Sequence, residues 1–227
     1  MITIAFCNSK GGTGKTTLTA AMAVEAANDS YRLGKKQVEY LVALVDLDPQ
    51  RSLTKWWEAR GRLENPFLVE GINSVQDAVD KLDYMEADLV MIDSPPAFIP
   101  TIESCIDAAD FVVMPLRASM LDVAASEDAV VLANDYEKPL LLVLNDVHKK
   151  EGVVGATAEW LGEQGIAVAE VEVEHRVSHT YAMMEGLTAR EKINGRFDKA
   201  ATAELAELWA EILSDMQEAG IDVGDRP

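Results

Sequence analysis

The sequence has 227 residues, of which 48% are hydrophobic and 26% are charged, as expected for one large globular α/β domain. Its 39 acidic residues outnumber the 20 basic ones, and the net charge of −19 argues against a surface that is basic overall. No apolar stretch approaches the roughly 20 residues of a membrane-spanning helix, and neither cysteine belongs to a metal or redox motif, so we expect a cytoplasmic protein.

Short apolar runs alternate with longer helical segments along the whole chain. The predicted strands are Ile2–Asn8, Leu41–Asp46, Phe67–Glu70, Leu89–Asp93, Phe111–Pro115, Leu140–Asn145 and Ile166–Val173. The predicted helices are Thr16–Ala27, Leu53–Arg60, Val75–Leu82, a segment before Phe111, Leu121–Tyr136, Val153–Gln164 and Ala200–Ala219. This order predicts a single doubly wound, mostly parallel sheet with helices on both faces over residues 1–227, with a flexible tail at 221–227. Such sheets bind ligands at the carboxyl ends of their strands.

A glycine-rich loop, Ser9–Thr17, connects the first strand to the first helix. Its glycines, Gly11, Gly12 and Gly14, allow the backbone to wrap around a phosphate, with the N–H groups near Thr13 pointing inward. The N-terminus of the helix adds its positive dipole end. The alternative is a simple glycine-rich turn, but the strand–loop–helix setting favours a phosphate-binding loop of the P-loop type.

Three side chains of this loop carry predicted roles in binding a nucleotide. Lys15 can reach the β- and γ-phosphates, and the Thr16 hydroxyl can ligate Mg²⁺. Thr17 would lie beside the α-phosphate. The usual P-loop pattern has a glycine at Ser9, whereas here a second lysine, Lys10, begins the glycine-rich segment.

Two predicted strands end in aspartate. Alternation along the second strand places Asp46 and Asp48 on the same side, where two carboxylates need a metal, a water or a cation to offset their charge. A helix N-cap followed by a turn at Pro49 is the alternative. The apolar strand Leu89–Asp93 has the form of a Walker B element, in which Asp93 holds a Mg²⁺-bound water.

These motifs together resemble the ParA/MinD family of deviant Walker ATPases, whose K-G-G-x-G-K-[ST] loop matches Lys10–Thr16. The resemblance implies that Lys10 reaches across an ATP-dependent homodimer to the phosphates of the partner subunit, instead of serving only its own nucleotide. It also implies that Asp48 positions or activates the attacking water and that Asp46 supports Mg²⁺ through its water shell.

The same resemblance assigns the base-reading residue. Asn145, at the end of the sixth strand, matches the asparagine that hydrogen-bonds the adenine edge, because an amide offers both a donor and an acceptor. A GTPase would carry Asn-Lys-x-Asp at this point, whereas Asn145 is followed by Asp146, so ATP is favoured over GTP. A simple turn at Asn145 is the alternative.

The resemblance favours a small partition ATPase, which dimerises on MgATP, binds DNA non-specifically and is reset when a ParB-like partner stimulates hydrolysis. The chain starts almost at its first strand, so we expect no N-terminal DNA-reading domain. Alternatives are a positioning or conjugation-associated ATPase with another cargo, and a metabolic ligase of the same fold. A membrane role is disfavoured because the last helix, Ala203–Ala219, is strongly acidic.

A basic run in the acidic C-terminal third supplies the candidate DNA contacts, which would place the protein on the nucleoid. The alternative is a solvated helix face. The candidates are Arg190, Lys192, Arg196 and Lys199.

Overall fold

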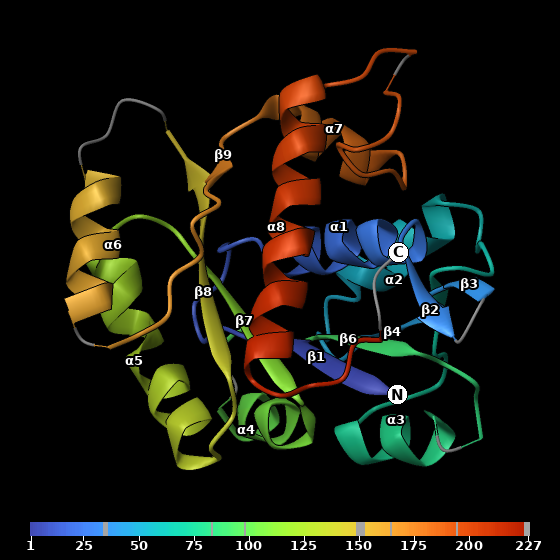
Figure 1. The fold of residues 1–227 in the computed structure, drawn as a ribbon, viewed down its shortest axis with the longest axis horizontal. Helices are drawn as coiled ribbons and strands as arrows, with labels where there is room; N and C mark the ends of the chain where they lie inside the picture. Colours follow the sequence, from blue (N-terminus) through green and yellow to red (C-terminus); the bar gives the residue numbers. More distant parts are fainter. Residues whose placement is uncertain are drawn as a thin grey trace.

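A seven-stranded sheet forms the centre of the molecule (Figure 1). The computed structural model describes residues 1–33, 36–82, 84–97, 99–148, 153–163, 165–193 and 195–224. The strand order is β5-β4-β6-β1-β7-β8-β9, and every pairing in it is parallel. The strands are β1 (Ile2–Phe6), β4 (Val42–Asp46), β5 (Phe67–Leu68), β6 (Leu89–Asp93), β7 (Phe111–Leu116), β8 (Leu140–Val147) and β9 (Val173–Glu174). The predicted fold class is confirmed.

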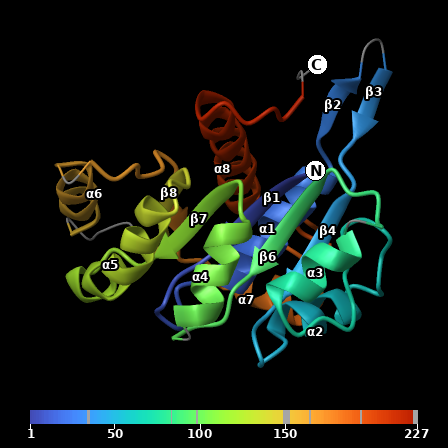
Figure 2. The ribbon, with the colours of Figure 1, turned by 90° about the horizontal axis from the view of Figure 1, so that it is seen from below.

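Helices cover both faces of the sheet, because successive strand residues point to opposite sides. In β1, Ile4 and Phe6 belong to one buried cluster, whereas Ala5 belongs to the other. The helices on the first face are α1 (Lys15–Ala27), α2 (Ser52–Ala59), α7 (Val177–Met184) and α8 (Lys199–Glu218). The helices on the second face are α3 (Val75–Leu82), α4 (Ile99–Ala108), α5 (Met120–Asp135) and α6 (Val153–Glu163). Figure 2 shows α3 and α4 on the side of the sheet opposite to α8.

Three features differ from the sequence prediction. An antiparallel hairpin, β2 (Ser30–Leu33) and β3 (Lys36–Glu39), projects from the sheet before β4 (Figure 2). The predicted strand Ile166–Val173 is mostly irregular, since it makes one isolated bridge to β8 before the short β9. The helix α7 was not predicted, because Ala182 is the one buried residue within this described segment and its sequence has no clear apolar stripe.

The C-terminal segment packs more closely than the predicted tail. The side chain of Val223 is buried, and the Tyr40 hydroxyl donates to the Val223 carbonyl oxygen at 2.5 Å. The last three residues, 225–227, lie outside the described residues. Within the described part of the chain, no helix combines the length and the apolar character needed to cross a membrane.

Candidate nucleotide-binding site

The loop between β1 and α1 has the backbone of a phosphate cradle. Gly12 has a φ of 76° and Gly14 a φ of 96°, which are left-handed conformations that favour glycine. Among the described residues, no side chain caps the N-terminus of α1, which begins directly after Gly14. The first amide groups of α1 are therefore available to a bound anion.

The two lysines of the loop have different surroundings. Lys15 is 6% exposed, and its ammonium group donates to the Lys10 carbonyl oxygen at 3.1 Å. Burial lowers the pKa of Lys15, while the charges of Asp93 and Asp48 act in the opposite direction. The side chain of Lys10 is 45% exposed, and its Nζ lies 3.4 Å from Oδ1 of Asp122 on α5. Lys15 is thus fixed inside the loop, whereas the side chain of Lys10 lies on the solvent-exposed side of the loop.

Thr16 and Asp93 lie together at the end of β6. The Thr16 hydroxyl donates to Oδ2 of Asp93 at 2.7 Å, and Asp93 is fully buried. Its Oδ1 has no hydrogen-bond partner within the described part of the chain, and burial raises the pKa of Asp93 to about 8. A Mg²⁺ ion fits these groups, because it would offset the buried charge and prefers oxygen ligands.

The other acidic strand end organises the start of α2. Asp46, 1% exposed, accepts hydrogen bonds from the Thr54 amide at 2.8 Å, from its hydroxyl at 2.7 Å and from the Asp48 amide at 3.1 Å. Asp48 is only half-buried and accepts from the Gln50 amide at 2.8 Å. Asp46 therefore fixes the loop that carries Asp48. The predicted role of Asp46 in a magnesium water shell stays a prediction.

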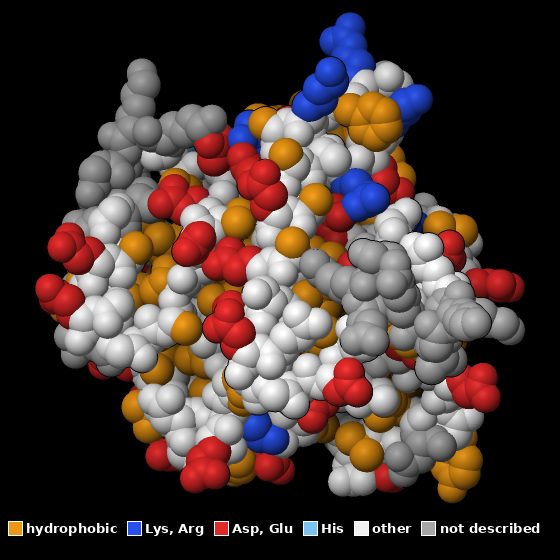
Figure 3. Space-filling view, in the orientation of Figure 1, with side chains coloured by type: hydrophobic (Ala, Val, Ile, Leu, Met, Phe, Trp, Pro, Cys, Tyr) orange, Lys and Arg blue, Asp and Glu red, His pale blue; other side chains and the backbone are white. Residues whose placement is uncertain are grey.

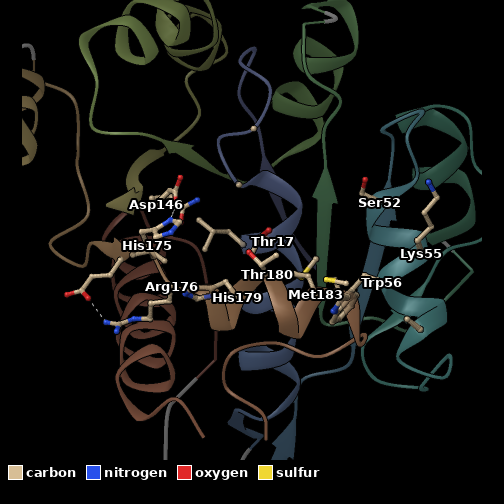
Figure 4. Close-up of a pocket in the computed structure, with 18 residues that line it drawn as sticks. Thr17, Ser52, Lys55, Trp56, Asp146, His175, Arg176, His179, Thr180 and Met183 are labelled. Carbon is tan, nitrogen blue, oxygen red and sulfur yellow. Dashed lines mark hydrogen bonds and ion pairs between the residues drawn. The ribbon is translucent and has the colours of Figure 1, made fainter. Parts of the chain in front are cut away.

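A cleft of about 570 Å³ extends from the loop, a volume within the range of ligand pockets. Figure 4 shows Asp146 and His175 on one side of it and Trp56 of α2 on the other, with Thr17 of α1 between them. The helix α7 supplies a further wall, which includes Thr180.

Asn145 contacts the loop directly. Its side-chain Nδ2 donates to the Thr13 carbonyl oxygen at 2.7 Å, and the residue is 8% exposed. A Cβ added at Gly14 would lie 2.0 Å from the same nitrogen, so only glycine leaves room for the amide. The structure therefore gives Asn145 a role that the sequence did not predict, as an anchor of the phosphate loop. Its reading of adenine stays a prediction.

A family model described as the CobQ/CobB/MinD/ParA nucleotide-binding domain matches residues 4–193. This chain belongs to that family. Two relatives are both named maintenance of carboxysome distribution protein A. That of Gloeobacter kilaueensis is 30% identical over 198 residues, 82% of each chain, and that of Halothiobacillus neapolitanus is 28% identical over 221 residues, 93% of this chain and 96% of its own.

The fold has a solved counterpart in a protein of Borrelia burgdorferi B31, described as a plasmid partition protein bound to AMPPNP. Its TM-score is 0.69 at 15% identity, and the match covers 96% of this chain and 99% of that one. At this identity the likeness supports the fold alone. The ParA/MinD resemblance of the sequence is nevertheless confirmed by the family match.

Sequence reasoning did not assign the residues of this ParA/MinD-family chain that gather around Asp146. Arg117 Nε lies 3.3 Å from Oδ2 of Asp146, and His175 Nδ1 lies 2.5 Å from its Oδ1. The rings of His148 and His175 stack with centroids 4.5 Å apart. One feature of the sequence could have indicated this cluster: its three histidines all lie between residues 148 and 179.

The four predicted DNA contacts separate into two groups. The Arg190 guanidinium pairs with Glu25 of α1, whose side chain is 2% exposed, so Arg190 has a structural partner inside the protein. Lys192, Arg196 and Lys199 are exposed near the start of α8, and Lys192 Nζ lies 5.3 Å from the centroid of a phenylalanine ring. Of the four, these three are the exposed ones and are the stronger candidate phosphate contacts, and DNA binding by any of the four stays a prediction.

Proposed function

We propose that this chain is a ParA-type ATPase that dimerises on MgATP, binds DNA non-specifically and is reset by partner-stimulated hydrolysis. The observation that carries the proposal is the arrangement of the two lysines. Lys15 is buried in the phosphate loop, whereas Lys10 is 45% exposed at its open side. A cation in that position is available to the nucleotide of a second subunit, which makes dimerisation depend on the terminal phosphate.

In this mechanism the protein positions and stabilises the groups that react. Asp48 accepts a hydrogen bond from the water that attacks the γ-phosphorus, while the bond to the bridging β–γ oxygen breaks to give ADP and phosphate. Lys15 and the amides after Gly14 stabilise negative charge on the phosphates. Thr16 and Asp93 would hold Mg²⁺, which supplies further charge neutralisation there.

The DNA surface of the proposal consists of Lys192, Arg196 and Lys199. The three are exposed and lie close together in sequence around the N-terminus of α8. Such a patch can bind phosphate on a protein whose net charge is −19, and a dimer would double it. DNA binding of this kind would place the ATP form on the nucleoid.

The cargo has two candidates. Plasmid or chromosomal DNA, linked through a ParB-like protein, follows from the resemblance of the motifs. A protein body is the second candidate, because the two relatives described above carry names that refer to carboxysome distribution. Imaging of the tagged chain would separate the two candidates. Foci that follow the plasmid or chromosome origin would support DNA, whereas foci that follow a protein assembly would support the second cargo.

The test of the nucleotide switch measures molar mass by light scattering and ATP turnover, with ATP, ADP or no nucleotide. We expect Lys10→Ala to retain ATP binding but to lose the ATP dimer and stimulated hydrolysis, and Asp48→Ala to accumulate the dimer. Lys55→Ala is a matched control, because Lys55 lines the same cleft but donates to the Gln50 carbonyl oxygen. Wild-type mass and turnover in both variants would contradict the proposed roles.

A further inference from the structure

A surface groove of about 610 Å³ lies between α7 and the N-terminus of α8, outside the nucleotide cleft. Its walls combine apolar and basic side chains: Val177 and Tyr181 from α7, Arg196 and Phe197 from the segment that leads into α8, and Lys199 from the first turn of α8. Lysine and arginine side chains gather next to exposed hydrophobic ones at this end of the molecule, while much of the visible face below carries acidic side chains (Figure 3).

The aromatic rings of the groove are unusually open to solvent. Phe197 is 54% exposed and Tyr181 is 57% exposed. The Lys192 ammonium lies 5.3 Å from the Phe197 centroid, within the distance of a cation–π contact. Phosphate binding requires only the cations and gives no reason for two exposed rings beside them.

One carboxylate lies in the groove, but its hydrogen bonds are directed inside the protein. Asp198 is the N-cap of α8: its Oδ1 accepts from the Ala201 amide at 3.1 Å, and its Oδ2 from the Ser178 hydroxyl at 2.7 Å. The exposed charges of the groove are therefore those of Arg196 and Lys199, joined by Lys192 at its edge. This charge complements a polyanion on a chain that is otherwise strongly acidic.

We infer that this groove binds single-stranded DNA, with Arg196 and Lys199 contacting phosphates and Phe197 and Tyr181 stacking on unpaired bases. Bases inside a duplex are stacked on one another, so a protein ring stacks without the cost of unstacking only on unpaired bases. The inference rests on the proposed DNA binding. It extends that proposal from contacts with phosphates to contacts with the unpaired bases of a single strand.

The experiment measures fluorescence anisotropy of three labelled 20-mers with the ATP-bound protein: oligo(dT), an abasic strand with the same phosphates, and a duplex. We expect oligo(dT) to bind at least about thirtyfold more tightly than the abasic strand, which is the effect of two stacked bases. Phe197→Leu should reduce this advantage, because only Tyr181 is then left to stack, while leaving the affinities for the abasic strand and the duplex unaffected. Tyr181→Phe, which keeps the ring, should behave like wild type.

Three results would overturn the inference. The first is equal affinity for oligo(dT) and the abasic strand, and the second is a Phe197→Leu variant that weakens the duplex as much as oligo(dT). The third is polyglutamate binding as tightly as oligo(dT), which would indicate an acidic protein segment as the occupant. In each of these three cases, duplex binding that requires ATP would still support the proposed function. If the protein forms the ATP dimer but binds none of the three DNAs, both the single-strand inference and the proposed DNA binding are wrong.

Discussion

Single side chains in this site act on the shape of the phosphate loop as well as on its ligand. Asn145 holds the Thr13 carbonyl oxygen, and Gly14 leaves the space that this amide occupies. Asp46 uses its carboxylate to fix the loop that carries Asp48. Preorganised groups of this kind bind phosphate with less loss of conformational freedom.

The anchoring role of Asn145 predicts a specific pattern in nucleotide affinity. Asn145→Ala removes the hydrogen bond to Thr13, so we expect the affinity for ATP and for GTP to fall together, by about tenfold each. A residue that reads adenine would instead lower the affinity for ATP alone. Titration with fluorescent ATP and GTP analogues distinguishes the two. Lys55→Ala is a suitable control, because Lys55 lines the cleft but donates to the Gln50 carbonyl oxygen and does not hold the phosphate loop.

At the scale of elements, α1 and α2 both connect the nucleotide site to the basic segment before α8. From α1, Glu25 pairs with Arg190. From α2, the Trp56 Nε1 donates to the Leu187 carbonyl oxygen at 2.9 Å, and Arg60 Nη1 lies 2.7 Å from a Glu191 carboxylate oxygen. The helices that begin at the phosphate loop and after Asp48 are therefore bonded to the segment that leads into the proposed DNA patch.

The pair between Arg190 and Glu25 predicts a loss of stability that a DNA contact would not show. Arg190→Met leaves the Glu25 carboxylate buried without its cation, and we expect the free energy of unfolding to fall by about 2 kcal/mol, less than for a fully buried pair. Urea unfolding measures this change. Lys192→Met is the matched control and should leave stability unchanged. If the free energy of unfolding of Arg190→Met equals that of the wild type, the pair with Glu25 contributes little to stability, and a DNA contact becomes the better explanation for Arg190.

The free energy of unfolding of the Arg190→Met variant should depend on pH in a defined direction. Burial raises the pKa of Glu25, and Arg190 opposes that rise. Without Arg190 the pKa of Glu25 in the folded state rises further above that in the unfolded chain. The folded state then binds this proton more tightly, so stability should increase as the pH falls from neutrality toward the unfolded pKa. The free energy of unfolding of the wild-type protein should change less over the same pH range.

Across the whole molecule acidic residues predominate, but three exposed cations lie close together around the N-terminus of α8. The net charge of −19 would oppose the approach of DNA to most of the surface, so the proposed DNA binding would depend on Lys192, Arg196 and Lys199 facing the phosphates. A monomer offers three such cations, whereas the proposed nucleotide-dependent dimer would offer six.

This charge distribution predicts the salt dependence of DNA binding. Six phosphate contacts give a slope of about −5 in a plot of log affinity against log salt concentration. Replacing Lys199 by alanine removes one contact per subunit and should reduce the slope by about 2. Anisotropy with a duplex at several salt concentrations gives both values. A salt-independent affinity in the ATP state would contradict binding through this patch.

The fold class, the family of nucleotide-binding proteins and the local motifs follow from the amino-acid sequence alone. These follow from patterns within short segments: the glycine loop, aspartates at strand ends, and apolar runs that alternate with helical segments. The predicted boundaries of the central strands differ from the structure by a few residues at most.

The contacts between side chains far apart in the sequence follow from the tertiary fold. Asn145 and Thr13 are 132 residues apart, and Arg190 and Glu25 are 165 apart, yet each pair is in contact. The order β1-β7-β8 brings the end of β8 to the phosphate loop, and the return of the chain after β9 brings α7 and the basic segment against α1 and α2. A local pattern does not specify such contacts, because they depend on strand order and on the packing of elements from across the whole chain.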